Sequence, residues 1–272
     1  MRGATRAEIR KIFTTRLWWG LIFGVVVIGG GTSALFASLV GTTTAGTSAA
    51  SNPFLHMSLG TAQLIYSAGF FYLIAPLIPL ALGVILITQE FRHQTITSTF
   101  LASPRRWEVL VSKTVAVVAI GIVYGVVHVI AAGGLGGMVL GLKSQPTYFD
   151  NADVWRTFGL ILLCFVLWAL LGFGFGMLVR NQLAAVFIAL GIALIAQIIL
   201  QVVFGALDWH TAPKLLPNNL SQGMLVTSDP TNGASGTGSP YFDWWACALI
   251  FLGYAAVLSA AGSWLLSRRD IS

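Results

Sequence analysis

The chain has 272 residues, of which 56% are hydrophobic and only 9% are charged, whereas soluble domains carry about 25% charged residues. Its formal net charge is +6 at pH 7, and no polar stretch between its apolar runs exceeds about 40 residues, fewer than a soluble domain usually needs to fold alone. These values exclude a soluble globular enzyme and predict a single membrane domain over residues 1–272.

Six long runs contain no Lys, Arg, Asp or Glu: residues 17–40, 64–88, 115–142, 158–179, 183–207 and 244–266. Each run exceeds the roughly 20 residues that an α-helix needs to cross a hydrocarbon layer about 30 Å thick. Because only backbone that satisfies its own hydrogen bonds is stable in lipid, the runs predict transmembrane helices. The predicted fold class is therefore an all-α membrane protein with six transmembrane helices.

The basic residues are distributed unevenly along the chain. Twelve of the fifteen Lys and Arg residues fall on one side of the six runs, and only Lys143, Arg156 and Lys214 fall on the other. Since short loops rich in Lys and Arg stay in the cytoplasm, both termini and the segment after the second run are predicted to be cytoplasmic. The positive charge thus indicates membrane topology and attraction to anionic lipid, and no nucleic-acid partner is expected.

Residues 1–16 have the pattern of an amphipathic helix. Ile9 and Phe13 recur at a helical spacing on an apolar face, while Arg10 and Lys11 lie on the opposite, cationic face. Such a helix lies in the membrane interface with its charges toward phosphate headgroups. Two interpretations fit this pattern: an elbow helix that transmits force along the membrane, or a basic anchor that only sets the topology.

Two prolines, Pro76 and Pro79, lie near the middle of the second run. Proline has no N–H and its ring clashes with the preceding turn of a helix. We therefore predict a kink in the second helix, with its freed carbonyls satisfied by neighbouring helices or by a wet cavity.

The segment 89–114 after the second run is predicted to be an exposed cytoplasmic element. Arg92 lies where the carbonyl end of the second helix favours positive charge, and Ser103-Pro104 has the form of an N-cap followed by a first-turn proline. The third helix should therefore begin before it enters the membrane. A soluble partner that pushes on a membrane protein needs such an element, although an ordinary loop would have the same composition.

No set of residues in the chain is suited to catalysis. His128 is the only ionisable side chain well inside a run apart from two thiols, and a lone buried histidine is usually a packing residue. Asp208 and His210 are two candidate metal ligands, too few for a site. The chain also has no G-x-x-x-x-G-K-[ST] motif for ATP. We expect no catalytic residue, metal or cofactor on this chain.

Gln197 and Gln201 are spaced i and i+4, so they share one face of the fifth predicted helix. They are candidates for a substrate path through the membrane. The alternative is that they only form hydrogen bonds to another helix, which is common among transmembrane helices.

The longest outer segment, residues 208–243, has two parts. Leu216, Leu220 and Met224 recur every four residues, which predicts a short helix with an apolar face. Residues 228–240 are rich in Gly, Ser, Thr and Pro, which predicts a mobile loop.

Several short motifs lie at the membrane boundaries of this layout. They are Arg16-Leu17-Trp18-Trp19, the segment from Glu90-Phe91-Arg92-x-x-Thr95-Ile96 to Leu101-Ala102-x-Pro104-x-Arg106, Lys113, Leu216-Pro217-Asn218-Asn219, and Arg268-Arg269-Asp270-Ile271. Through these motifs and the six runs, essentially the whole chain resembles the permease subunits of ABC-2 type transporters, especially the small six-span permeases common in actinobacteria.

The resemblance implies a type V (ABC-2) exporter-like fold in the bacterial plasma membrane, with residues 1–16 as the elbow helix. It implies that the permease pairs with a second copy or a paralogue, and that two copies of a separate ATPase bind ATP and Mg. The segment 89–114 would couple to this ATPase. Its docking residues would be Glu90, Phe91, Arg92, Thr95, Arg105 and Arg106.

The resemblance also implies that residues 208–243 form a re-entrant outer gate that includes Leu216, Leu220 and Met224. Because the predicted path carries no charge, hydrophobic or amphipathic cargo such as a drug, an antibiotic peptide or a lipid fits better than ions or sugars. Two alternatives stay open. An ion-coupled secondary transporter usually carries buried Asp, Glu or His, and a non-transporting membrane scaffold would not need a docking segment.

Overall fold

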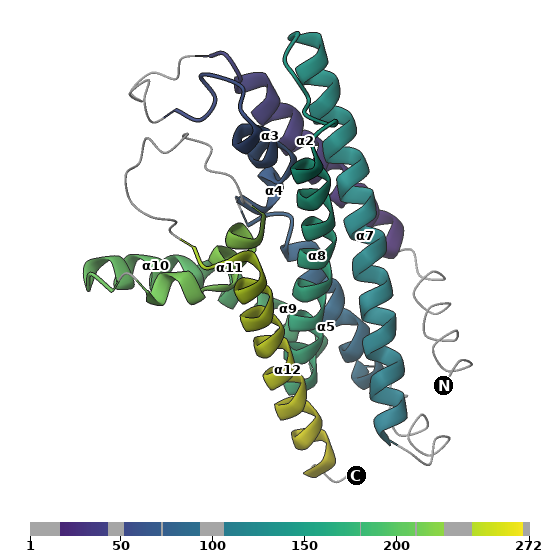
Figure 1. Cartoon of the computed structure of the whole chain (residues 1–272). Helices are drawn as coiled ribbons and strands as arrows, with labels where there is room; N and C mark the ends of the chain where they lie inside the picture. The colour runs from purple at the N-terminus through teal and green to yellow at the C-terminus, as the bar shows by residue number, and fades with distance from the viewer. Residues whose placement is uncertain are drawn as a thin grey trace.

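A computed structural model describes residues 17–42, 52–71, 73–92, 106–179, 181–209, 211–225 and 241–268. Every regular element in these ranges is a helix, and the longer helices form a bundle (Figure 1). The elbow helix predicted at 1–16 and the loop predicted at 228–240 lie outside the described residues.

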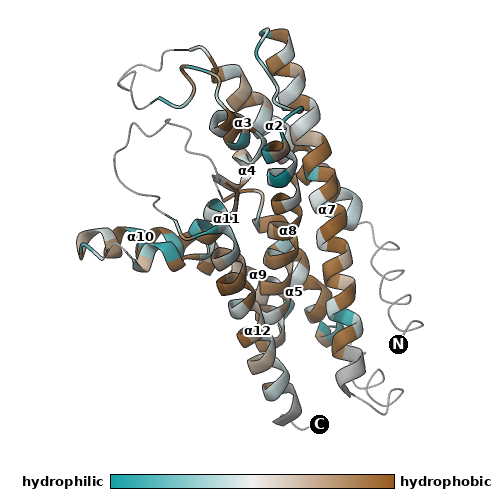
Figure 2. Ribbon diagram, in the orientation of Figure 1, coloured by the Kyte–Doolittle hydropathy of each residue, from teal (hydrophilic) through white to brown (hydrophobic). Residues whose placement is uncertain are grey.

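Helix α8 (Ala152–Leu178) is the centre of the bundle. It packs against α5 (Leu77–Arg92), α7 (Arg106–Leu142) and α12 (Trp244–Arg268), and α2 (Leu17–Leu39) packs against α7. Apolar residues cover most of the surface of these helices, as expected for helices that face either lipid or one another (Figure 2).

Burial of α8 follows from its sequence, which is apolar around the whole circumference. Ile161, Phe165 and Trp168 are completely enclosed. The helix begins six residues before the apolar run at 158–179, because the side chain of Asn151 caps it by accepting a hydrogen bond from the backbone N–H of Asp153 at 2.9 Å.

Two glycines allow α5 and α8 to approach closely. A Cβ on Gly83 would lie 2.0 Å from the carbonyl oxygen of Ala169, and a Cβ on Gly172 would lie 2.0 Å from that of Leu80. Helices in lipid are held together by close van der Waals packing, since lipid tails are as apolar as the side chains. These two positions therefore set the distance between α5 and α8.

The second run does not form one continuous helix, so the expectation of an uninterrupted span over 64–88 is wrong. It contains the end of α3 (Leu59–Tyr66), the whole of α4 (Ala68–Phe71) and most of α5. These three helices follow one another from one end of the bundle to the other (Figure 1).

The break before α5 has a local cause. Leu73 has a left-handed backbone with φ of 59°, and the N–H of Ala75 turns back to bond the carbonyl of Gly69 at 2.9 Å. Pro76 cannot donate the N–H that a continuing helix requires. The prolines therefore separate two helices here, where only a kink was predicted, and Pro79 lies in the first turn of α5, where its missing N–H costs little.

Helix α7 has 37 residues and begins at Arg106, so at about 1.5 Å per residue it is longer than the hydrocarbon layer is thick. The third helix therefore begins nine residues before the apolar run at 115–142. Its first turns and the last turn of α5 lie at the same end of the bundle as the end of α12 (Figure 1).

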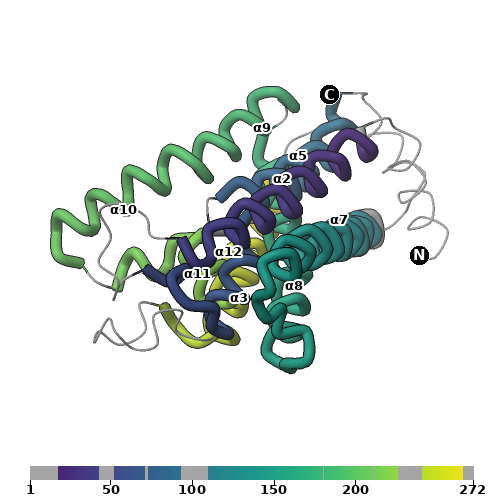
Figure 3. Tube along the Cα trace, turned by 90° about the horizontal axis from the view of Figure 1, so that it is seen from above, coloured from purple at the N-terminus to yellow at the C-terminus, as the bar shows by residue number. Residues whose placement is uncertain are grey.

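The fifth run forms α9 (Gln182–Gly191), a π-helical segment η2 (Ile192–Ala196) and α10 (Gln197–Ala206). Seen from above, this long rod runs along one side of the bundle, and α10 extends away from the other helices (Figure 3). Many of its apolar side chains are exposed, among them Phe187, Ile199 and Val203.

In the part of the chain that the structure describes, five helices are long and apolar enough to cross a membrane: α2, α7, α8, the α9–α10 rod and α12. The fold is thus an all-helical, multi-pass membrane arrangement. The second run is the one that does not supply a single long helix.

The glycine contact between α5 and α8 yields a test of this packing. We expect Gly172→Ala to lower the melting temperature of the detergent-purified chain, because the new methyl group would overlap the Leu80 carbonyl. Gly159→Ala, on the same helix with nothing within 4 Å of its Cβ, is the matched control. It should leave the melting temperature unchanged or raise it, since Ala favours helix over Gly by about 1 kcal/mol. Equal effects of the two changes would contradict the close approach.

Candidate functional site

A short helix enters the bundle before the last span. Residues Ala212–Leu215 form a 3-10 turn, η3, and Pro217–Leu225 form α11, which packs against α12, α8 and α4. The short helix predicted from Leu216, Leu220 and Met224 is confirmed, and these three side chains are buried. Helix α11 is therefore largely enclosed by protein.

Polar side chains from neighbouring elements hold α11 in place. The indole N–H of Trp168 donates to the Ser221 hydroxyl at 2.8 Å, and the Tyr254 hydroxyl donates to the Leu215 carbonyl at 3.1 Å. The Tyr241 hydroxyl donates to Gln222 Oε1 at 2.6 Å. Burial raises the pKa of Tyr241 above its ordinary value of 10.0, so its hydroxyl keeps its proton and remains a donor.

The two glutamines of α10 contact the start of α11. Gln197 Oε1 accepts the backbone N–H of Asn218 at 3.3 Å, and Gln201 Oε1 accepts from Asn219 Nδ2 at 3.0 Å. The first N–H groups of a helix have no partner within it, so Gln197 supplies one from another element. The hydrogen bonds expected from the packing interpretation are present.

An apolar cavity of about 450 Å³ lies beside this contact, between α5, α8, the α9–α10 rod, α11 and α12. Trp168, Phe175, Ala193 and Leu258 are among its lining residues, and Gln197 contributes an amide. Its volume is within the range of about 300–1,000 Å³ that is typical of small-molecule sites.

A second cavity of about 440 Å³ lies on the other side of the same contact. Its lining is more polar and comprises Leu73, Leu194, Gln197, Ile198, Gln201, Val202, Asn218, Asn219, Gln222 and Tyr241. None of these described lining residues carries a charge at neutral pH. Gln197 lines both cavities.

The π-helical segment orients this part of the rod. A π turn inserts one extra residue and rotates the side chains that follow it, and such turns are frequent at functional sites. Within η2, Ala193 is buried and lines the apolar cavity, whereas Ile195 is 63% exposed. Gln197 follows directly and points to α11 through the hydrogen bond to Asn218.

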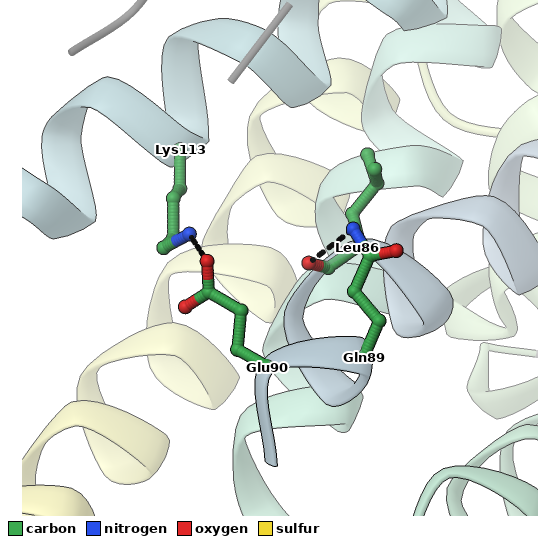
Figure 4. Close-up of polar contacts among 4 residues, drawn as sticks. All are labelled: Leu86, Gln89, Glu90 and Lys113. Carbon is green, nitrogen blue, oxygen red and sulfur yellow. Dashed lines mark hydrogen bonds and ion pairs between the residues drawn. The ribbon is translucent and has the colours of Figure 1, made fainter. Parts of the chain in front are cut away.

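An ion pair joins α5 and α7 at the predicted cytoplasmic end. The Lys113 ammonium donates to Glu90 Oε1, and the side chains are only 5% and 2% exposed, respectively. Figure 4 shows the two side chains pointing toward one another from the two helices, while Gln89 turns to the Leu86 carbonyl of its own helix. Glu90 was predicted among the exposed docking residues, but in the structure it is enclosed and binds Lys113.

The other predicted docking residues are placed only in part. Phe91 is half-buried, and Arg92 is exposed and donates from Nη1 to Gln182 Oε1 at 3.4 Å, which links the end of α5 to the start of α9. Thr95 and Arg105 lie outside the described residues, and Arg106 begins α7. The elbow residues Ile9, Arg10, Lys11 and Phe13 also lie outside them.

His128 of α7 packs among apolar and aromatic neighbours. It is 1% exposed, its ring lies 5.7 Å from that of Phe70 and 5.2 Å from that of Phe165, and a Cβ on Gly29 would lie 2.6 Å from its Nδ1. Within the described ranges no group of three His, Cys, Asp or Glu side chains comes together to hold a metal. The site is thus built from neutral hydrogen-bonding groups.

Comparison with known protein families agrees with this arrangement. The sequence profile of a family described as ABC-2 family transporter protein matches residues 5–271. The chain belongs to this family. A comparison with curated proteins found no match.

Members of this family are membrane components of ABC transporters, so this ABC-2 permease acts together with an ATPase partner. Membership accounts for the multi-pass helices and for a site without catalytic groups. It does not decide which cargo is carried or in which direction.

Sequence analysis missed several residues of this site. Trp168, Ser221 and Tyr254 have no distinguishing spacing, and each was assigned only to an apolar run or to the outer segment. The sequence did contain a signal for the pairing of Glu90 with Lys113, because these two opposite charges flank consecutive runs at the same predicted membrane surface. We expected no charge inside the bundle and did not pair them.

The ion pair gives a prediction about stability. Lys113→Met should lower the free energy of unfolding by roughly 3–5 kcal/mol, because it leaves the Glu90 carboxylate buried without its countercharge. Adding Glu90→Met should restore most of the loss, since two apolar side chains replace the pair. Melting temperatures of both single variants and the double variant in detergent measure this. If the double variant were as unstable as the sum of the single variants, the two residues would not be coupled.

A second prediction concerns the contact between α10 and α11. Gln197→Leu should speed hydrogen exchange of the Asn218 amide about fivefold, because a neutral hydrogen bond contributes about 1 kcal/mol. Mass spectrometry of the peptide covering 213–225 measures the exchange. Gln89→Leu is the control, since within the described part of the chain the Gln89 side chain donates to the Leu86 carbonyl of its own helix. Unchanged exchange in Gln197→Leu would show that this side chain does not hold α11.

Proposed function

We propose that this ABC-2 permease is the membrane subunit of an exporter that moves a hydrophobic or amphipathic molecule out of the cytoplasm or the inner leaflet. A drug, an antibiotic peptide or a lipid fits this description. A separate ATPase, present in two copies, binds ATP and Mg and supplies the energy. The observation that carries the proposal is the position of α11, which lines two uncharged cavities. It receives hydrogen bonds from α8 and α10, and the turn η3 directly before it receives one from α12.

Helix α11 is the gate in this proposal. Its anchors are neutral hydrogen bonds, each contributing about 1 kcal/mol, and its apolar side chains Leu220 and Met224 are fully buried. A movement of α11 would break and re-form only a few such contacts at a time. The free-energy cost of the movement would therefore stay within the range that ATP hydrolysis on the partner supplies.

The described contacts form a continuous route from the cytoplasmic end to the gate. The Glu90–Lys113 pair, within segment 89–114, joins α5 to α7, and Arg92 joins α5 to the start of α9. The rod from α9 to α10 then reaches α11 through Gln197 and Gln201. In the proposal, movement of the docked ATPase shifts α5 and this rod, and the glutamines transmit the shift to α11.

The proposal includes six crossings of a bacterial plasma membrane, with both termini in the cytoplasm and residues 1–16 as an elbow helix. The helices α3, α4 and α5 together make the crossing that is not a single long helix. The support is the uneven distribution of Lys and Arg and the course of these helices along the bundle (Figure 1).

A pair of permeases is part of the proposal. The α9–α10 rod exposes apolar side chains at Phe187, Ile199 and Val203 and extends away from the bundle. A second copy or a paralogue of this permease, with lipid around it, would cover that surface.

The cavities favour this proposal over an ion-coupled secondary transporter. Such transporters place carboxylates or other ionisable groups at the substrate site, whereas the described lining residues of both cavities are uncharged. A scaffold without transport would need neither the cavities nor an enclosed α11.

Charge reversal tests the docking of the ATPase. Arg105→Glu with Arg106→Glu should weaken co-purification of the ATPase partner, because complementary charges across an interface steer and hold the partner. Arg156→Glu with Lys214→Glu, a double reversal on the predicted outer side, is the matched control. Quantitative pull-down from membranes that contain both subunits measures the difference.

Equal recovery of the ATPase by the two double variants would contradict the docking role. The isolated permease should also show no ATP hydrolysis, and robust hydrolysis by the purified chain alone would overturn the proposed division of labour.

A further inference from the structure

The two cavities share a boundary. Gln197 lines both, and consecutive residues at the start of α11 line one or the other: Leu216 and Pro217 the apolar cavity, Asn218 and Asn219 the polar one. A molecule that passed beside Gln197 would therefore have its apolar part in one cavity and its polar part in the other.

An unused hydrogen-bond acceptor lines the polar cavity. Asn218 is 9% exposed, and its Oδ1 has no hydrogen-bond partner among the described residues. A buried acceptor without a partner destabilises the fold, because it has lost its hydrogen bonds to water. The backbone N–H of the same residue is already bonded to Gln197 Oε1, so the side chain is held at the cavity while its oxygen remains available to a donor.

The chemistry of the lining limits the headgroup that would fit. The polar cavity offers amides from Gln197, Gln201 and Asn219 and the hydroxyl of Tyr241, and none of its described lining residues is charged. A charged headgroup would lose its hydration without a countercharge from these residues, which is far more costly than burying a hydroxyl. A headgroup with O–H or N–H donors would satisfy Asn218 Oδ1.

The apolar cavity limits the other part of the ligand. Among its lining side chains only those of Gln197, Tyr254 and Trp168 have polar atoms. The Trp168 indole already donates to Ser221 of α11, and the Tyr254 hydroxyl already donates to the Leu215 carbonyl of η3. A hydrocarbon chain fills such a space without leaving a polar group unsatisfied.

We propose that the two cavities form one binding site for an uncharged amphiphile, with a hydroxyl- or amide-bearing headgroup against Asn218 and a hydrocarbon chain in the cavity beside Ala193. The inference rests on the proposed transport function only in taking this amphiphile as cargo. Occupancy of the binding site would also affect the position of α11, because the ligand contacts the residues that hold the start of that helix.

Photolabelling of the full chain in nanodiscs tests the site. The probe is a monoacylglycerol with a diazirine in its oleyl chain, and labelled peptides are identified by mass spectrometry. Specific labelling is the part that excess unlabelled monoolein removes. We expect it on the peptides that contain Ala193 and Leu258, which come from opposite walls of the apolar cavity.

Competitors that share the same hydrocarbon chain and differ only in their headgroup test the headgroup assignment. Monoolein should compete about fivefold better than methyl oleate, which lacks a donor for Asn218. Its advantage over oleate should be larger, because oleate is charged. In Asn218→Leu the advantage of monoolein over methyl oleate should disappear. Equal competition by the three compounds in the wild-type chain would overturn the headgroup assignment without the need for any variant.

Two substitutions in the same π turn test the chain site. Ala193→Trp fills the apolar cavity and should reduce specific labelling roughly tenfold, because a packed site does not tolerate the added volume. Ile195→Trp, on the exposed side, should leave the labelling unchanged. Undiminished labelling in a folded Ala193→Trp variant, judged by its melting temperature, would overturn the proposal.

The outcomes distinguish this inference from the proposed function. Labelling needs no ATPase, so loss of specific labelling with intact ATPase docking would refute the amphiphile site and leave the transporter with another cargo. Specific labelling without ATPase docking would retain the site and refute the exporter.

Discussion

Lipid supplies no hydrogen bonds, and this constraint decides where the chain of the ABC-2 permease can depart from the α-helix. The break between α3 and α5 is one such place, and the buried start of α11 is another. Both are enclosed by protein: Leu73 and Ala75 are buried, and the N–H of Asn218 bonds to the Gln197 side chain. Helix α8 makes this possible, since it packs against both α5 and α11 and provides a wall for each. The interior of the bundle can therefore hold irregular backbone and two cavities.

The kinds of polar contact differ along the bundle. At the predicted cytoplasmic end an ion pair, Glu90–Lys113, joins two helices at full burial. Around α11 the contacts are neutral hydrogen bonds, such as that from Trp168 to Ser221. A buried ion pair is hard to separate, because each partner would be left as an uncompensated charge. Neutral hydrogen bonds can be exchanged at much lower cost. This distribution suits a rigid end that receives force and a movable element beside the cavities.

Sequence analysis was most accurate where local pattern alone decides the structure. The apolar runs correspond to long helices for α2, α7, α8, the α9–α10 rod and α12, because length and lack of charge are sufficient for a membrane helix. The four-residue spacing of Leu216, Leu220 and Met224 identified α11 for the same reason. The prediction of one long helix in the second run was wrong, because hydropathy depends only on residue type and contains no information about backbone geometry. Pro76 and the left-handed Leu73 divide an apolar stretch that composition alone presents as continuous.

The amino-acid sequence by itself determined the class of protein, the number of apolar runs, the uneven charge and the family, since each depends on the order of residue types alone. Only the tertiary structure decided what the polar residues do. Glu90 lies buried against Lys113 although it was expected on the surface, and Gln197 contacts Asn218, because each pair joins two different helices. The two cavities lined by Gln197 also exist only through the packing of the α9–α10 rod against α11. Contacts of this kind depend on how helices cross, and helix periodicity contains no information about crossing.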